Sequence, residues 1–84
     1  MKILILVALQ EELDANDIPD FKVCYTGVGK VNAAYKTLQA IQKYSPELII
    51  NFGTAGSLNS QLSGLIEVSS FYQRDMDASP LGFE

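Results

Sequence analysis

Blocks of apolar and polar residues alternate along this chain with spacings that predict a small α/β unit. Strands are predicted over residues 2–9 and 47–52, which contain the unbroken aliphatic runs 3–9 and 48–50, and such runs are typical of parallel strands that are buried on both faces. Residues 21–26 alternate in part and predict another strand. A fourth strand is predicted over residues 65–72. We expect the first of these strands to be central in the sheet.

Between the strands at 21–26 and 47–52, apolar residues recur at spacings of three and four, which predicts a helix over Lys30–Tyr44. Ser45 and Pro46 end this helix, because proline disfavours helical geometry in the residue before it. The two strands and the helix then form a right-handed, parallel βαβ unit. The helix carries one apolar stripe, which we expect to face the core: Val31, Ala34, Tyr35, Leu38 and Ile41.

The expected fold class is α/β, with three α/β/α layers around a central, mostly parallel or mixed sheet. The chain has 84 residues and 48% hydrophobic content, so it holds one small domain with a limited core. One amphipathic helix covers little more than one face of a sheet whose strands require cover on both. We therefore expect residues 1–84 to be the N-terminal portion of a single domain, or a chain that completes itself by association.

Charge and cysteine content limit the classes of partner and the cellular location that we expect for the protein. The net charge is −4 and the sequence has no Lys/Arg cluster, which disfavours nucleic acid and anionic membranes as partners, because phosphate neutralisation needs basic residues. The N-terminal apolar run is too short to span a bilayer and leads at once to Glu11 and Glu12. Cys24 has no internal disulfide partner and is expected to be a small buried residue. A cytoplasmic protein is expected.

Two carboxylates follow the first strand directly, and ligands of open α/β sheets gather at such strand ends. Glu11 or Glu12 could act as a general base or position a water molecule. The more ordinary interpretation is that both are solvated first-turn residues that complement a helix dipole, and the sequence alone gives no physical reason to choose between Glu11 and Glu12. The sequence contains no histidine, which excludes Ser–His and Cys–His catalysis and His-ligated metal sites within the chain. We expect no metal and no cofactor.

Two glycine-containing turns also follow strands. The turn at residues 27–30 opens a helix and could offer backbone N–H groups to an anion. It lacks the P-loop spacing, and Asn32 stands where the third glycine of a dinucleotide-binding turn belongs, so a tight packing turn explains it equally well. In the second turn, Gly53 and Gly56 flank Thr54, whose hydroxyl could bind a sugar or water, or could cap a local N–H.

Taken together, these segments resemble the nucleoside phosphorylase/hydrolase superfamily, most closely the bacterial 5′-methylthioadenosine/S-adenosylhomocysteine nucleosidases. The matching segments follow the family's order: residues 1–12, 26–34, 47–56 and 75–84. The resemblance implies hydrolysis of the N-glycosidic bond of an adenine nucleoside, with water attacking the ribosyl carbon. It also implies a homodimer.

The same resemblance assigns roles to individual positions. Glu12 matches the catalytic residue that orders and deprotonates the attacking water. Eight positions match substrate-binding residues: Ala8, Val28, Thr54, Ala55, Gly56, Ala78, Leu81 and Phe83. In the family the first two line the ribose and 5′-substituent, and the next three lie near the ribose, the water and the nucleoside's underside. The last three belong to a loop that reaches the apolar 5′-alkylthio pocket of the other subunit.

The chain also departs from the family. Residues 13–20 are too few for the strand pair that the family carries there. The family's purine-protonating aspartate and ribose-binding glutamate lie in a second half that this sequence does not contain, so we expect the 84-residue chain alone to be inactive. Arg74 is the only arginine, which favours water over phosphate as the nucleophile. The alternatives are a purine nucleoside phosphorylase and a non-catalytic nucleoside-binding or assembly fragment.

Overall fold

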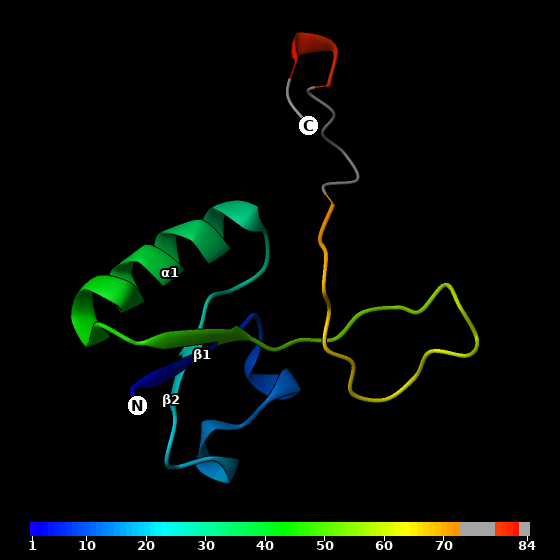
Figure 1. The fold of residues 1–84 in the computed structure, drawn as a ribbon. Helices are drawn as coiled ribbons and strands as arrows, with labels where there is room; N and C mark the ends of the chain where they lie inside the picture. The colour runs from blue at the N-terminus through cyan, green and yellow to red at the C-terminus, as the bar shows by residue number, and fades with distance from the viewer. Residues whose placement is uncertain (73–78, 83–84) are drawn as a thin grey trace.

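The computed structural model describes residues 1–72 and 79–82. Its sheet contains β1 (Ile3–Val7), β2 (Lys22–Tyr25) and β3 (Leu48–Asn51). One α-helix, α1 (Lys30–Tyr44), connects β2 to β3 (Figure 1). Three short 3-10 helices complete the described elements: η1 (Gln10–Glu12), η2 (Ala15–Asp17) and η3 (Ser79–Leu81).

The sheet is parallel, with the order β2-β1-β3. In the register, Leu4 lies opposite Lys22 on one side and Ile49 on the other. The prediction that the first strand is central is therefore confirmed. Leu4 and Val7 are 1% and 0% exposed and form the centre of the core, because only a strand with neighbours on both sides has its backbone fully paired.

Local backbone chemistry sets the limits of α1, which match the predicted bounds. The helix begins after Gly29, whose φ of 101° favours glycine. Asn32 Nδ2 donates a hydrogen bond of 2.8 Å to the Val28 carbonyl and so stabilises the first turn. The helix ends at Ser45, which adopts the left-handed conformation and donates its N–H to Ile41.

The face that α1 turns to the sheet differs from the predicted one. Ala40 is buried, and Thr37 and Tyr44 are half-buried. The predicted apolar stripe is exposed instead: Val31 is 83% exposed and Leu38 57%. At 3.6 residues per turn, the stripe and the sheet-facing residues lie about a third of a turn apart. The small Ala40 lets the helix approach the sheet closely, and the larger apolar residues then point away.

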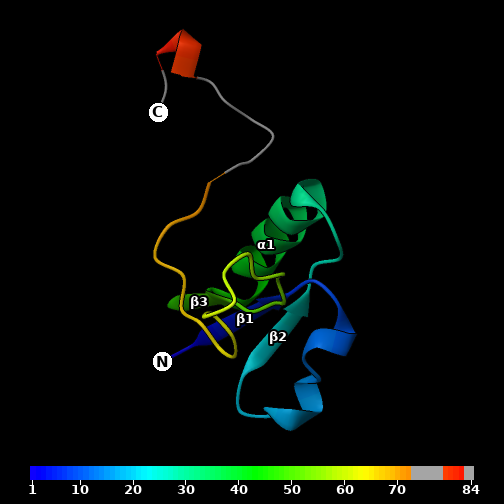
Figure 2. The ribbon, with the colours of Figure 1, turned by 90° about the vertical axis from the view of Figure 1, so that its right-hand side faces the viewer.

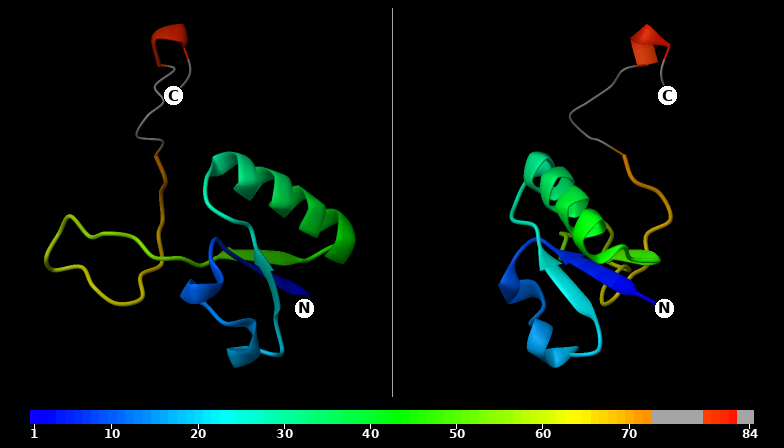
Figure 3. Two further views of the ribbon diagram at one scale, coloured as in Figure 1. Left: turned by 180° about the vertical axis from the view of Figure 1, so that it is seen from behind. Right: turned by 90° about the vertical axis from the view of Figure 1, so that its left-hand side faces the viewer.

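The predicted strand over residues 65–72 is wrong. This segment follows an irregular path beyond β3 and pairs with none of the described strands (Figure 3). Leu65 is 89% exposed and Phe71 is 77% exposed. An apolar composition favours a strand only where a neighbouring strand pairs with its backbone, and the described residues offer this segment no such neighbour.

The described residues therefore form an incomplete α/β fold. The helix α1 packs on one face of the sheet, as Figure 2 shows. Across residues 1–72 and 79–82 there is no second α-helix to form another layer. None of the helices in this part of the chain is long and apolar enough to cross a membrane.

Candidate functional site

A carboxylate and a hydroxyl residue meet at the carboxyl edge of the sheet. Glu12 ends η1, shortly after β1, and Thr54 follows β3. Because β1 and β3 are parallel neighbours, the carboxyl ends of both strands lie at the same edge of the sheet. Glu12 Oε2 accepts hydrogen bonds from the Thr54 N–H at 2.8 Å and from Thr54 Oγ1 at 2.9 Å. Two residues 42 positions apart thus form one polar pair.

The turn before Glu12 fixes the direction of its carboxylate. Glu12 Oε1 accepts a hydrogen bond of 3.1 Å from the Leu9 N–H, and the Glu12 N–H donates to the Leu9 carbonyl at 3.0 Å. This is the carboxylate half of a capping box. On the other side, a methyl group at Gly53 would lie 3.4 Å from Glu12 Oε2. A methyl group there would make ordinary van der Waals contact, so the approach of the carboxylate to Thr54 does not itself require glycine.

These hydrogen bonds lower the pKa of Glu12 below its ordinary value of 4.5. The Thr54 hydroxyl is the largest cause, followed by the Thr54 backbone N–H, and partial desolvation opposes them. The carboxylate is consequently ionised at neutral pH. The geometry also separates the two glutamates that the sequence left equivalent, because Glu11 is exposed beside the pair and Glu12 forms it.

Tyr25 supports this edge, although the sequence analysis did not single it out. Its hydroxyl donates to the Leu13 carbonyl at 2.6 Å and accepts from the Ala15 N–H at 2.9 Å. These bonds attach the segment after Glu12 to the end of β2. A half-buried tyrosine usually finds a partner for its hydroxyl, so its place at a strand end beside a short connection was the available signal.

The turn at Gly27 lies next to the turn after β1, because the Gly27 N–H donates to the Ala8 carbonyl at 3.0 Å. Ala8 is half-buried there, whereas Val28 is 67% exposed. The Asn32 side chain lies 3.5 Å from the position of a Cβ on Gly27. Asn32 thus fills the space beside the turn. The interpretation as a tight packing turn accounts for Gly27 and Gly29, which flank Val28.

The remaining expected site residues are not gathered at the pair. Ala55 and Gly56 follow Thr54 and are exposed. Leu81 is 78% exposed in η3, which lies apart from the sheet in Figures 1 and 3. The resemblance assigns Leu81 to the pocket of a second subunit, so its position in one chain does not bear on that role. Ala78 and Phe83 lie outside the described residues.

A search for metal-binding groups over the described ranges finds no cluster of three or more His, Cys, Asp or Glu side chains that could hold an ion. Cys24 is a half-buried, free thiol on β2. The chemistry available at the carboxyl edge is therefore that of an ionised, hydrogen-bonded carboxylate with a neighbouring hydroxyl.

A parallel sheet with a crossover helix and a polar pair at its carboxyl edge defines an α/β protein, a class in which ligands bind at this edge of the sheet. Comparison with known families makes the assignment specific. The family described as "Phosphorylase superfamily" matches residues 21–83. The chain belongs to the phosphorylase superfamily.

Curated relatives are similar to most of the chain. A 5′-methylthioadenosine/S-adenosylhomocysteine nucleosidase of Staphylococcus haemolyticus is 41% identical over 61 residues, which is 70% of this chain. The protein of that name from Staphylococcus epidermidis is 44% identical over 61 residues, also 70% of this chain. One from Staphylococcus aureus (strain bovine RF122) is 41% identical over 64 residues, or 74% of this chain.

The matches cover only 27%, 27% and 28% of these three relatives. The chain therefore spans little more than a quarter of their length. No solved structure gives a significant match. The family likeness seen in the sequence is confirmed, and the similarity is to the N-terminal region of nucleosidases.

Proposed function

We propose that this chain is the N-terminal portion of a hydrolase that cleaves the N-glycosidic bond of adenine nucleosides, namely 5′-methylthioadenosine and S-adenosylhomocysteine. The observation that carries the proposal is the Glu12 carboxylate held by Thr54 at 2.8 and 2.9 Å at the carboxyl edge of the sheet. The names of the similar nucleosidases supply the substrate class. The complete protein would have the three-layer fold of which this chain forms part.

In the proposed mechanism, Glu12 orders the attacking water. A carboxylate has roughly four lone-pair positions, and three hydrogen bonds from Leu9 and Thr54 occupy this one. The fourth position has no partner among residues 1–72 and 79–82 and can accept a hydrogen bond from water. The water oxygen bonds to the ribosyl carbon as the bond to adenine breaks, the water's proton passes to Glu12, and adenine takes a proton from a group outside this chain.

The lowered pKa of Glu12 fits late proton transfer. Its carboxylate is a weak base towards ordinary water. Once the bond to adenine is largely broken, however, the sugar resembles an oxocarbenium ion and the adding water becomes strongly acidic. Glu12 then needs only to be ionised and correctly placed. In this proposal Ala8, Val28, Ala55 and Gly56 line the nucleoside.

The test uses the complete protein with 5′-methylthioadenosine, assayed for adenine release. Glu12→Gln should lower kcat by about 10²–10⁴-fold, the usual contribution of general acid–base catalysis. Glu11→Gln is the matched control, since Glu11 is an exposed neighbour of the same charge, and it should retain activity. Equal activity of Glu12→Gln and the parent protein would refute the proposed role.

Two further measurements separate the alternatives. Turnover that requires added phosphate would identify a phosphorylase, and binding without turnover would identify a non-catalytic protein. The isolated 84-residue chain should release no adenine, because the proposed base-protonating group lies outside it. Normal turnover by this chain alone would contradict the proposal.

The complete protein is further proposed to be a homodimer, in which the loop containing Ala78, Leu81 and Phe83 reaches the partner's pocket. Exposed apolar residues on α1, including Val31 and Leu38, support an association surface. Sedimentation of the parent protein should give a dimer, and Leu38→Glu should shift it towards monomer. A monomeric parent would end this part of the proposal. The cytoplasmic location stays a prediction, which cell fractionation tests.

A further inference from the structure

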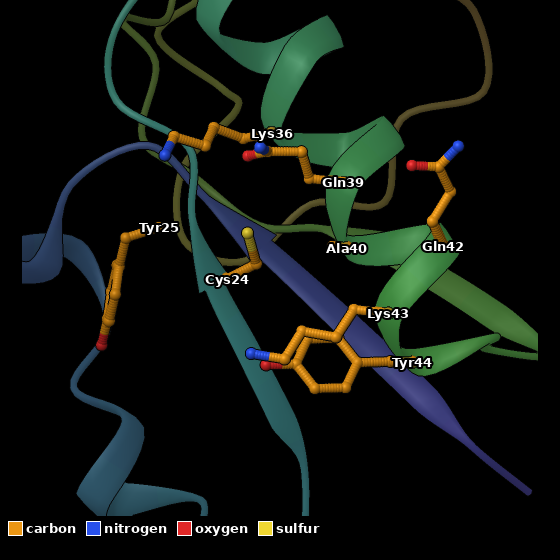
Figure 4. A pocket seen from close by; sticks show the side chains of 8 residues that line it. All are labelled: Cys24, Tyr25, Lys36, Gln39, Ala40, Gln42, Lys43 and Tyr44. Atoms are coloured by element: carbon orange, nitrogen blue, oxygen red, sulfur yellow. The ribbon is translucent and has the colours of Figure 1, made fainter.

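Four of the five lysines lie along two adjacent hollows, although they are far apart in the sequence. The larger hollow, of about 600 Å³, lies between β2 and α1 and includes Lys36 and Lys43 in its lining (Figure 4). The smaller, of about 420 Å³, includes Lys2 and Lys22. Lys43 and Tyr44 line both hollows. We call the combined surface the lysine groove.

This groove extends to the edge of the sheet opposite the Glu12–Thr54 pair. Lys2 and Lys22 lie at the amino ends of β1 and β2, whereas Glu12 and Thr54 follow carboxyl ends. The last turn of α1, with Lys43 and Tyr44, lies at the amino edge because the helix runs back against the strands (Figure 1). The groove is therefore a second place on the fold, separate from the candidate nucleoside site.

Two of the ammonium groups flank one aromatic ring. Lys22 Nζ lies 4.4 Å from the centre of the Tyr44 ring, and Lys43 Nζ lies 5.3 Å from it. Lys22 is the main cause of a lowered pKa of the Tyr44 hydroxyl, and Lys43 adds to it. The ring thus holds two positive charges near each other by cation–π contacts. An anion bound near both ammonium groups reduces their mutual repulsion.

The charge balance of the groove is positive, in contrast to the net charge of −4 for the chain. Against the four lysines stand Asp20, which lines the smaller hollow, and Glu47, which accepts a hydrogen bond of 3.1 Å from the Lys2 N–H. The C-terminus of α1 adds about half a negative charge. Four positive charges exceed these contributions, so the groove attracts anions.

We propose that the lysine groove binds the oligophosphate group of a small molecule. Lysine ammonium groups are compact charges that suit phosphate oxygens, and Gln42 lines the larger hollow with a further amide, whereas the Gln39 amide donates to the Tyr35 hydroxyl at 3.1 Å. The volumes of the hollows are those of small-molecule sites. Because the lysines are spread over two joined hollows, a chain of phosphates contacts several of them at once, whereas a single phosphate contacts few.

The test is a titration of the ¹⁵N-labelled 84-residue chain with inorganic triphosphate, followed by NMR. Saturable shifts are expected at Lys22 and over the last half of α1. The double variant Lys36→Gln/Lys43→Gln should bind about tenfold or more weakly, since each removes a charge-assisted contact. Lys30→Gln is the matched control, because Lys30 is on the same helix and lines neither hollow. It should change the affinity less than about twofold.

Three outcomes would overturn the proposal. One is the absence of saturable shifts, and another is an equal loss of affinity in Lys30→Gln, which would mean diffuse attraction only. The third is citrate binding as tightly as triphosphate, which would exclude selection for phosphate. Circular dichroism checks that the variants fold. The shift map of the parent chain needs no variant, so it decides the question even if a substitution unfolds the chain.

Discussion

Residues 1–52 and residues 57–72 both contain large apolar side chains, yet fully buried ones occur only in the first region. Leu4 and Val7 are 1% and 0% exposed, whereas Leu65 is 89% and Phe71 77% exposed. The strand that contains Leu4 is hydrogen-bonded on both sides. The segment that contains Leu65 pairs with none of the described strands. Burial is greatest in the central strand, and apolar composition alone does not produce it, since Ile50 on the edge strand β3 is 41% exposed.

The strongest test of this comparison makes the same substitution in both regions. Leu4→Ala should lower the free energy of unfolding by about 2–5 kcal/mol, because it leaves a cavity in the core. Such a loss approaches the whole stability of a small domain. Leu65→Ala should change it by less than about 0.5 kcal/mol. Urea unfolding followed by circular dichroism measures both, and similar losses would show that residues 57–72 also pack.

A second test distinguishes the two faces of α1. Ala40→Leu inserts bulk between the helix and the sheet and should destabilise the chain by about 1–3 kcal/mol. Ala34→Leu adds the same groups on the exposed apolar stripe and should be nearly neutral. Thermal unfolding of the two variants gives the comparison. A larger loss for Ala34→Leu would mean that the predicted stripe, and not Ala40, faces the sheet.

The contact between Glu12 and Thr54, which follows β3, has a smaller expected effect on stability. Thr54→Val removes the hydroxyl that donates to Glu12 at 2.9 Å but keeps the backbone N–H. A loss of about 0.5–1 kcal/mol is expected, because a net hydrogen bond is modest near solvent. Thr54→Ser keeps the hydroxyl and should lose less than half of that. If Thr54→Val and Thr54→Ser are equally stable, the hydroxyl bond to Glu12 does not contribute to stability.

The smallest expected effect is a pH dependence from the same contact. The folded pKa of Glu12 is lowered from 4.5, so the unfolded chain binds more protons below that pH. Its contribution to stability is complete above the unfolded pKa and is lost as pH falls through the folded pKa. Unfolding midpoints between about pH 3 and pH 6 measure it. Thr54→Val should flatten the slope, and an unchanged slope would assign it to other carboxylates.

Much of the first region could be predicted from the sequence. The bounds of α1 follow from apolar spacing and from Pro46, and the central place of β1 follows from its aliphatic run. The approach of Glu12 to Thr54 follows from parallel topology, since both residues come after strands. These features depend on local patterns and on one general rule about strand ends.

Other features depend on contacts that a linear pattern does not contain. The face of α1 is set by the close approach at Ala40, and apolar spacing favoured the stripe around Leu38. The exposure of Leu65 reflects a missing neighbour, which the residues themselves do not reveal. The lysine groove could not be predicted from the sequence, because its four lysines lie on separate segments that only the fold brings together.

The strand order β2-β1-β3 has a consequence for synthesis. β1 leaves the ribosome first, but its partner β3 follows about 45 residues later in the register of Ile3 with Leu48. Pairings so distant in sequence form slowly, because a long loop must close first. In a nascent chain stalled before Leu48, the aliphatic strand β1 has one unpaired edge, which can pair with another chain and aggregate. Continued translation supplies β3, which covers this edge.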